Sequence, residues 1–401
     1  MLFIRDIDML KENINRIIIV NNNLHIGGVQ KALVNLLWNI REKYDITLLL
    51  FHPEGAYMSQ LPPEVKVITP DSGYRYLGMP GSDAKTLKDK LGRTFYAGIS
   101  RVLGRKLAVS FMKRGQKTVG EYDVAISYLH NSGAKSFYGG CNDFVLNHVS
   151  AKKKIAFLHC DYTLSGCNTP DNNRQYARFD TIAACSQGCA EAFLSINPGL
   201  ADRVKVVPNC HRFDQIRQLA QAAPVALTED KIHLLTVARL GREKGVERAV
   251  QAIAGLGALK ERIHYYIIGD GAQKAVLLET LEREQLQGYV TVCGKMENPY
   301  GYMKAADLLL IPSRSEAAPL VIGEAASLGT PVLSTKTSSA VEMIAEPSLG
   351  WVCENNVQAM TDALAGLVAN PGLIQGKNND LENKKFHNEA AIALFAQCLE
   401  Q

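Results

Sequence analysis

Two glutamates, Glu316 and Glu324, lie in a segment that could bind a phosphorylated sugar. A short apolar run precedes the segment, and Pro319 is predicted as the first residue of a helix, where its missing N–H costs nothing. The free N–H groups of Leu320 and Val321, with the helix dipole, would then form a seat for a diphosphate. Glu324 follows one turn later, where a carboxylate can accept both hydroxyls of a ribose. Glu316 precedes the helix and would point at whatever lies beyond the phosphates.

A second group of candidate residues is cationic. Arg239 and Lys244 follow an apolar run at 232–237 and can meet in a loop. A guanidinium fork matches phosphate oxygens, and fixed positive charge stabilises a departing diphosphate. Taken singly, a surface cation pair and two unrelated carboxylates would explain these residues as well. Residues suited to bind phosphate follow two predicted strands of the same sheet, and this coincidence favours a diphosphate-binding site.

The elements that position these residues follow one repeated pattern: short apolar runs without alternation, each followed by helical periodicity. Such runs are typical of parallel strands covered on both faces. The predicted strands are 16–20, 46–51, 65–68, 124–128, 154–159, 181–184 and 204–207, then 232–237, 264–268, 290–292, 308–311, 331–334 and 350–353.

A polar, Ala-rich stretch at 215–230 separates the two arrays and indicates a connector. The sequence therefore predicts an α/β protein with two doubly wound, Rossmann-like domains and a cleft between them. We assign residues 1–215 to the first domain and 216–380 to the second. Residues 381–401 are predicted as a helix that can pack back on the first domain.

The segment 85–117 is strongly basic, with ten Lys and Arg residues between Asp83 and Lys117 against two aspartates. Apolar and aromatic residues recur among them at helical spacing. Such a helix can lie in an anionic membrane surface, or it can be a solvated helix packed on its domain. Gly92, Gly98 and Gly104 argue against one continuous helix.

Composition excludes several classes of protein. The 401 residues are 47% hydrophobic and 21% charged, which excludes wholesale disorder and a fibrous chain. A net charge of +4 is too weak to indicate nucleic acid as a partner. No run reaches the length of a membrane span, and Asp6 and Asp8 fall where a signal peptide needs apolar residues, so we expect a cytoplasmic protein. None of the nine cysteines forms a CxxC pair, and Cys185-x3-Cys189 is the closest spacing, so no zinc site is predicted.

The order and spacing of several segments resemble the retaining GT-B glycosyltransferases of glycosyltransferase family 4, many of which build bacterial capsule, exopolysaccharide or lipid-linked glycans. The resemblance spans nearly the whole chain. It rests on the Gly-Gly loop and helix at 27–33, the histidine segment at 157–161, the Pro-Asn turn at 207–210, the Gly-x-Gly strand end at 267–271, the loop at 293–296, the cations Arg239 and Lys244, and the Glu-x7-Glu motif of Glu316 and Glu324.

The resemblance implies transfer of a hexose, with retention, from a UDP- or GDP-sugar to a glycan or polyprenyl-linked acceptor in cell-surface polysaccharide synthesis. In that scheme Glu316, His159, Arg239 and Lys244 are the catalytic residues, and His159 orients the sugar or acceptor or moves a proton. The donor would be bound by Gly27, Gly28, Asn209, Met296, Pro319, Leu320, Val321 and Glu324. No metal is expected, because Asp6-x-Asp8 precedes the first strand, and no cofactor is expected beside the nucleoside-diphosphate sugar. The protein could then be peripheral at the inner face of the membrane.

The chain departs from the family pattern at three places. Ala317-Ala318 replaces the usual Gly-Phe after the first glutamate, so sugar preference is not transferable. Cys210 replaces a glycine after Asn209, and 338–340 replace a Gly-rich turn. None of these changes removes a charged catalytic group.

Three different functions also fit parts of the sequence. Gly269-Asp270-Gly271 follows a strand, as in an NAD-dependent dehydrogenase, but Lys274 stands where the third glycine should be. A nucleotide-sugar epimerase with the GT-B fold, or a non-catalytic subunit that binds a sugar nucleotide, would carry the same phosphate-binding motifs.

His159 also has an alternative interpretation. It could be an ordinary histidine near the core.

Overall fold

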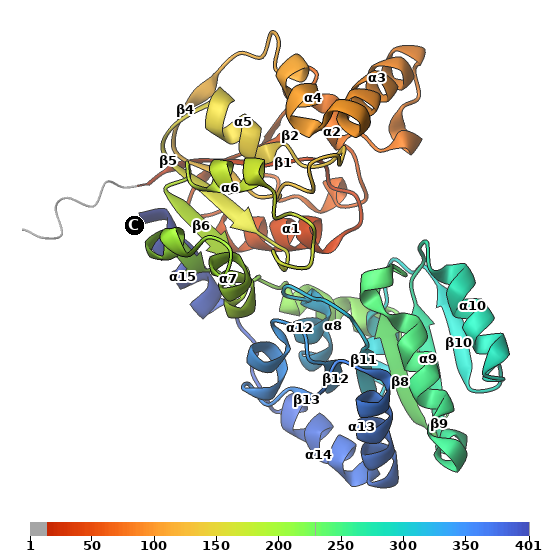
Figure 1. The fold of residues 1–401 in the computed structure, drawn as a ribbon. Coiled ribbons are helices and arrows are strands. Elements are labelled where there is room, and N and C mark those ends of the chain that lie inside the picture. Colours follow the sequence, from red (N-terminus) through yellow and green to blue (C-terminus); the bar gives the residue numbers. More distant parts are fainter. Residues whose placement is uncertain (1–13, 229, 401) are drawn as a thin grey trace, which may run out of the picture. The chain divides into compact units, whose positions relative to one another are not determined.

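The computed structural model describes residues 14–228 and 230–400, which divide into two compact units (Figure 1). Unit 1 comprises the residues up to Cys210 together with those from Asn388 onward, and unit 2 comprises His211–His387. Asp6 and Asp8 lie outside the described residues. The chain thus passes from unit 1 to unit 2 at 210–211, whereas the sequence suggested 215–216.

Unit 1 is built on one parallel sheet in the order β3-β2-β1-β4-β5-β6-β7. Chain order reverses beside β1, as in doubly wound folds. The strands are β1 Arg16–Asn21, β2 Asp45–Leu50, β3 Lys66–Ile68, β4 Val119–Ser127, β5 Val149–Leu158, β6 Thr181–Ala184 and β7 Val204–Val206.

Alternate residues of β1 enter two different cores, one on each face of the sheet. Ile18 and Val20 pack in one cluster, with side chains from α4, α5 and α6. Ile17 and Ile19 pack in the other, with side chains from α1 and α15. The helices of unit 1 are α1 Gly28–Ile40, α2 Arg75–Gly78, α3 Leu87–Leu103, α4 Arg105–Met112, α5 Cys141–His148, α6 Pro170–Tyr176, α7 Gln187–Leu194 and α15 Glu389–Glu400.

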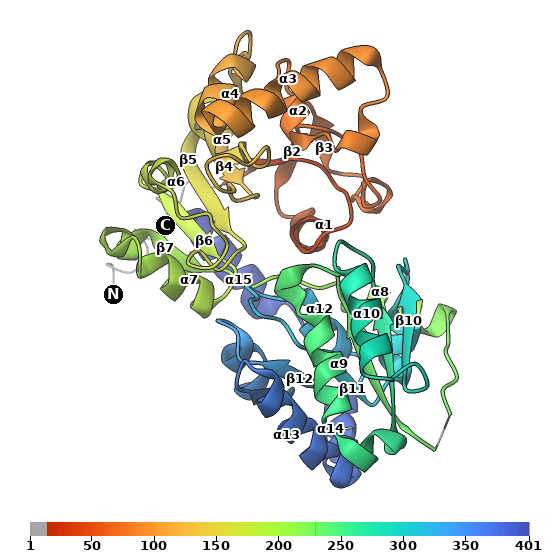
Figure 2. The same ribbon diagram turned by 45° about the vertical axis from the view of Figure 1, so that its right-hand side comes forward.

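Unit 2 repeats the arrangement with a parallel sheet in the order β10-β9-β8-β11-β12-β13. Its strands are β8 Ile232–Val237, β9 Ile263–Ile268, β10 Val290–Gly294, β11 Leu308–Ile311, β12 Val332–Thr335 and β13 Gly350–Cys353. Its helices are α8 Phe213–Ala222, α9 Val246–Ala254, α10 Lys274–Arg283, α11 Tyr300–Ala305, α12 Leu320–Ala326, α13 Val357–Ala369 and α14 Pro371–Glu382. Leu234 and Leu235 of β8 enter separate cores, so helices cover both faces of this sheet (Figure 2).

Every strand predicted from the sequence is confirmed within the part of the chain that the structure describes. The largest differences are at β4 and β5, which begin earlier than predicted, at Val119 and Val149. The first halves of these two strands are polar and partly exposed, yet they pair with each other. Apolar runs mark only the buried halves of such strands.

The basic segment forms two helices rather than one. Gly104, with φ +90°, separates α3 from α4, as the glycines suggested. Side chains of α3 are largely exposed, and α2 lies beside this helix (Figure 2). Among the described helices, none is both long enough and apolar enough to cross a bilayer.

Candidate functional site

Lys244 and Glu316 form an ion pair at the carboxyl ends of β8 and β11. The Lys244 Nζ lies 2.7 Å from Glu316 Oε1 and 2.8 Å from Oε2. The side chains are 24% and 9% exposed, respectively. Two of the predicted catalytic residues, 72 positions apart in the chain, are thus brought into direct contact.

Close backbone packing brings these two loops together. Gly245 has φ +57°, and a Cβ at this position would lie 2.6 Å from the carbonyl oxygen of Pro312. The buried Arg248 donates hydrogen bonds to that same oxygen and to Asn355 Oδ1. The main-chain N–H of Arg314 donates to the carbonyl of Glu243 at 2.8 Å. A glycine is therefore required after Lys244 for the loop to reach Glu316.

Hydroxyl groups hold the Glu316 loop in place. Ser313 Oγ donates to Glu316 Oε1 at 2.7 Å, and Ser338 Oγ donates to the Glu316 carbonyl at 2.9 Å. Thr335 Oγ1 donates to the Ser313 carbonyl at 2.6 Å. Sequence reasoning missed these residues. Ser313 could have been found, because it precedes Glu316 by only three positions in a loop.

Arg239 makes a different contact from the one that Lys244 makes. Its guanidinium pairs with Glu243 at 2.5 Å, and its side chain is 72% exposed. The two predicted cations are thus paired with separate carboxylates. An anion that engages either cation has to compete with a carboxylate for it.

Helix α12 begins one residue later than predicted. Pro319 is the residue before the helix, with extended backbone (φ −69°, ψ 119°), and Leu320 is the first helical residue. The φ of Pro319 suits a helix, but its ψ does not continue one.

Glu324 is on helix α12 and only 5% exposed, and Val321 is partly buried. The Leu320 carbonyl lies 3.1 Å from Nε2 of the buried His211, whose ring packs against Gly323.

The Gly-x-Gly segment after β9 has a structural role. A Cβ on Gly269 would lie 1.8 Å from the carbonyl oxygen of Ala238, at the start of the loop that carries Arg239. The main-chain N–H of Leu240 donates to the Asp270 carbonyl in the same contact. Close packing accounts for the glycine that suggested a dinucleotide fingerprint.

Met296, in the loop after β10, is partly buried against the core of unit 2.

The predicted donor residues of unit 1 lie in two loops. Gly27 caps α1, where a Cβ would lie 2.4 Å from Gln30 Oε1. Gly28 opens the helix, and among the described residues outside the local helix backbone no atom lies within 4 Å of a Cβ built there. Asn209 is partly buried after β7, and the carbonyl of the following residue accepts a hydrogen bond from Asn35.

His159 directly follows β5 and packs among aromatic rings. Its ring centroid lies 4.6 Å from that of Tyr128 and 5.5 Å from that of Phe157, and the latter contact is stacked. Within the described residues its Nε2 has no hydrogen-bond partner. Burial lowers the pKa of His159 to about 3, and the nearby His130 adds to the shift. His159 is therefore a neutral imidazole at physiological pH.

Comparison with known proteins agrees with this architecture. Residues 218–387 match the family model described as glycosyl transferases group 1. The chain is 26% identical over 229 residues to the phosphatidylinositol N-acetylglucosaminyltransferase gpi3 subunit of Schizosaccharomyces pombe, a match that covers 55% of this chain and 48% of that protein. It is 32% identical over 145 residues to a putative colanic acid biosynthesis glycosyltransferase, WcaL, of Salmonella typhimurium, covering 33% of this chain and 35% of that one. The chain spans about half, or less, of the length of the curated relatives it matches.

A solved structure extends the likeness to both units. The crystal structure of Anabaena Alr3699/HepE in complex with UDP and glucose superposes with a TM-score of 0.66 at 19% identity, covering 96% of this chain and 99% of that one. The fold is therefore GT-B, with two Rossmann-like domains.

Proposed function

We propose that this protein is a retaining glycosyltransferase that moves a hexose from a UDP- or GDP-sugar to a glycan or lipid-linked acceptor. The observation that carries the proposal is the Lys244–Glu316 ion pair at the carboxyl edge of the sheet of unit 2. This edge lies within the segment that matches the glycosyl transferases group 1 model. UDP bound in the similar HepE structure supports a nucleoside diphosphate as the leaving group.

The proposed reaction breaks the bond between the sugar C1 and the diphosphate oxygen, which keeps the electron pair. Lys244 and Arg239 neutralise the charge that develops on the departing diphosphate, which is where fixed positive charge lowers a barrier most. The N–H groups at the start of α12 add to this. Donor binding displaces the Lys244 ammonium from Glu316, and Glu316 is then free to accept hydroxyls of the donor sugar.

The acceptor hydroxyl attacks C1 on the face that the diphosphate leaves, so that the anomeric configuration is retained. Its proton passes to an oxygen of the leaving diphosphate or to His159. The lowered pKa of His159 suits a neutral group that orients the acceptor, and it favours the diphosphate oxygen as the group that takes the proton. Glu324 binds the ribose, with Gly27, Gly28, Asn209 and Met296 as further donor contacts.

Sugar transfer in this scheme needs no metal, because side-chain cations hold the diphosphate. Initial rates measured with added Mg²⁺ or Mn²⁺ and without either ion should agree. A strict requirement for either ion would contradict metal independence.

We further propose that the acceptor is presented at a membrane. Leu87, Leu91 and Phe95 of α3 are exposed at helical spacing, beside the exposed Lys88. This apolar face with basic neighbours suits the headgroup region of an anionic bilayer. The similarity to a colanic acid enzyme supports a cell-surface polysaccharide as the product. The protein would then act as a peripheral protein at the inner face of the membrane.

One correction concerns the basic segment 85–117. Arg105 is only 3% exposed and pairs with Asp143 at 2.8 Å and Asp171 at 3.6 Å. It stabilises unit 1 and is not available to a membrane. Lys106, in contrast, is exposed.

The experiment that tests the function begins with thermal-shift screening of UDP, GDP, ADP and their sugars. The best donor is then incubated with polyprenyl-linked and glycan acceptors, and product and donor are followed by mass spectrometry. Transfer by the isolated chain supports the proposal. Isomerised donor without acceptor would indicate an epimerase instead. Donor binding with neither reaction would indicate a non-catalytic partner subunit.

A further inference from the structure

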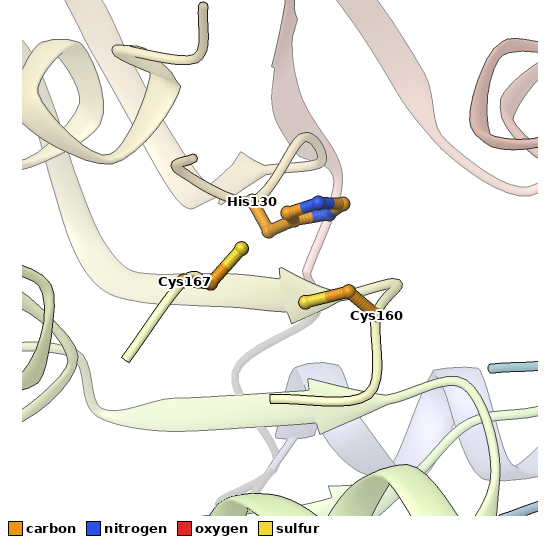
Figure 3. A group of neighbouring side chains, drawn as sticks. All are labelled: His130, Cys160 and Cys167. Atoms are coloured by element: carbon orange, nitrogen blue, oxygen red, sulfur yellow. The ribbon is translucent and has the colours of Figure 1, made fainter. Parts of the chain in front are cut away.

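His130, Cys160 and Cys167 form a cluster at the carboxyl edge of the sheet of unit 1 (Figure 3). One ligand atom from each residue lies within 4.8 Å of the other two. His130 follows β4, whereas Cys160 and Cys167 belong to the loop after β5. Figure 3 shows the Cys167 sulfur directed toward the His130 ring and the Cys160 sulfur directed toward Cys167.

The buried side chain of Asn172 links the two loops that carry these residues. Asn172 Nδ2 donates to the Ser132 carbonyl at 3.1 Å and to the Cys167 carbonyl at 2.8 Å. Its Oδ1 accepts a hydrogen bond from the buried Arg105 at 3.0 Å. The loop after β4 is thereby held against the loop after β5, so that His130 and Cys167 face each other.

The chain between the two cysteines is a compact turn. Asp161 Oδ1 accepts hydrogen bonds from the main-chain N–H groups of Thr163 and Leu164 and from the Thr163 hydroxyl. The Ser165 N–H donates to the Asp161 carbonyl at 3.0 Å. The turn returns Cys167 to Cys160, and both thiols are buried. The hydrogen bonds of the two loops therefore hold the backbones of His130, Cys160 and Cys167 so that their ligand atoms lie close together.

Two sulfurs and an imidazole nitrogen are ligands that zinc prefers. Zinc–sulfur bonds of about 2.3 Å and zinc–nitrogen bonds of about 2.0–2.1 Å place tetrahedral ligand atoms roughly 3.5–3.8 Å apart. Ligand atoms within 4.8 Å of one another need only a small inward movement to reach that geometry. Two cysteines alone would suit a disulfide, but the histidine on a separate loop adds a third donor aimed at the same space.

We propose that His130, Cys160 and Cys167 bind a zinc ion, with a water molecule as the fourth ligand. The ion would tie the loop after β4 to the loop after β5. Because His159 directly precedes Cys160, zinc would also fix the backbone from which His159 projects. The site is distinct from the diphosphate site at the edge of the other sheet, and metal-independent sugar transfer does not conflict with it.

The test uses the full chain, purified under reducing conditions, stripped with a chelator and reloaded with zinc. Metal content is measured by inductively coupled plasma mass spectrometry after gel filtration. We expect one zinc ion per chain in the wild type and in the control variants Cys293→Ser and Cys353→Ser, which change thiols of unit 2. We expect Cys167→Ser and His130→Gln to lose the ion.

Cobalt gives a readout that needs no variant. Co²⁺ bound by the wild type should produce an absorption band from cobalt–thiolate bonds, and zinc should abolish it. Zinc should also raise the melting temperature of the wild type but not that of His130→Gln. The proposal is overturned by a reduced wild type that takes up no zinc, by an unchanged zinc content in both ligand variants, or by a chain isolated without metal in which Cys160 and Cys167 form a disulfide.

Discussion

Unit 1 and unit 2 share a parallel, doubly wound sheet, yet the loops at the carboxyl ends of their strands carry different side chains. In unit 2 the loops are charged, and Lys244 and Glu316 are paired at 2.7 Å. In unit 1 the corresponding edge carries the imidazoles of His159 and His130 and the buried thiols of Cys160 and Cys167. The comparison teaches that one topology can present an ion pair at the carboxyl edge of one sheet and imidazoles with sulfurs at that of the other.

The largest effect is expected from the charged edge. Lys244→Ala should lower kcat/KM by about 10²–10³-fold, because it removes a cation from the departing diphosphate. Initial rates with saturating acceptor measure the effect, and circular dichroism checks the fold. Lys274→Ala is the matched control, since Lys274 forms an exposed pair with Asp270 in the same unit. Equal losses in the two variants would remove the special role of Lys244.

The next effect concerns the membrane surface of unit 1. Changing Lys88, Arg101 and Lys106 together to Ser should weaken binding to anionic vesicles by roughly 100-fold, at about 1 kcal/mol for each charge. Vesicle sedimentation with phosphatidylglycerol measures the change. The control removes Arg262, Arg283 and Lys304, which are exposed on unit 2. Absence of vesicle binding by the parent protein would exclude the membrane proposal.

Glu324 tests the ribose contact at the charged edge. Glu324→Ala should weaken nucleotide binding by roughly 1–3 kcal/mol, the usual cost of losing hydrogen bonds to a charged group. Isothermal titration calorimetry with the preferred nucleoside diphosphate gives the value. Glu346→Ala, an exposed glutamate of unit 2, serves as the control. Equal affinity in wild type and Glu324→Ala would remove the ribose role.

The smallest effect concerns His159 at the carboxyl edge of unit 1 and its pH dependence. The pKa of His159 is about 3 in the folded chain and about 6.5 when unfolded, so below pH 6.5 the unfolded chain binds a proton that the folded chain does not. This group therefore leaves the unfolding free energy unchanged above pH 6.5 and lowers it progressively as the pH falls from 6.5 toward 3. When the pH is lowered from 6.5 to 5, His159→Phe should lose about 1.5 kcal/mol less unfolding free energy than the wild type. Urea unfolding at both pH values checks this, and identical losses would mean that His159 titrates normally.

Much of the fold could be predicted from the sequence, because buried parallel strands are apolar runs that need no partner to be recognised. The strand at 308–311 and its following loop are one example. The pairing of Lys244 with Glu316 was not predicted, since it depends on the approach that Gly245 permits at Pro312. Arg105 is one of the ten cations counted in the basic segment 85–117. Its burial against Asp143 was not predicted, because it depends on tertiary contacts that helical spacing does not show.

The sequence analysis missed the cluster of His130, Cys160 and Cys167 for a related reason. Metal sites are recognised in sequences by short ligand spacings, and Cys160 and Cys167 are separated by six residues, with His130 on another loop. The pairing of β4 with β5, the turn at Asp161 and the hydrogen bonds of Asn172 bring the three together. The cysteine spacing that the sequence singled out, Cys185-x3-Cys189, places two thiols 3.7 Å apart, and within 14–228 and 230–400 they belong to no group of three possible metal ligands.

The most direct test of the central claim is a crystal structure of the full chain with its preferred nucleoside diphosphate. The claim predicts diphosphate oxygens within hydrogen-bond distance of Lys244 Nζ and Arg239, with Glu324 against the ribose hydroxyls and Glu316 released from Lys244. A nucleotide bound elsewhere, with Lys244 still paired to Glu316, would contradict it.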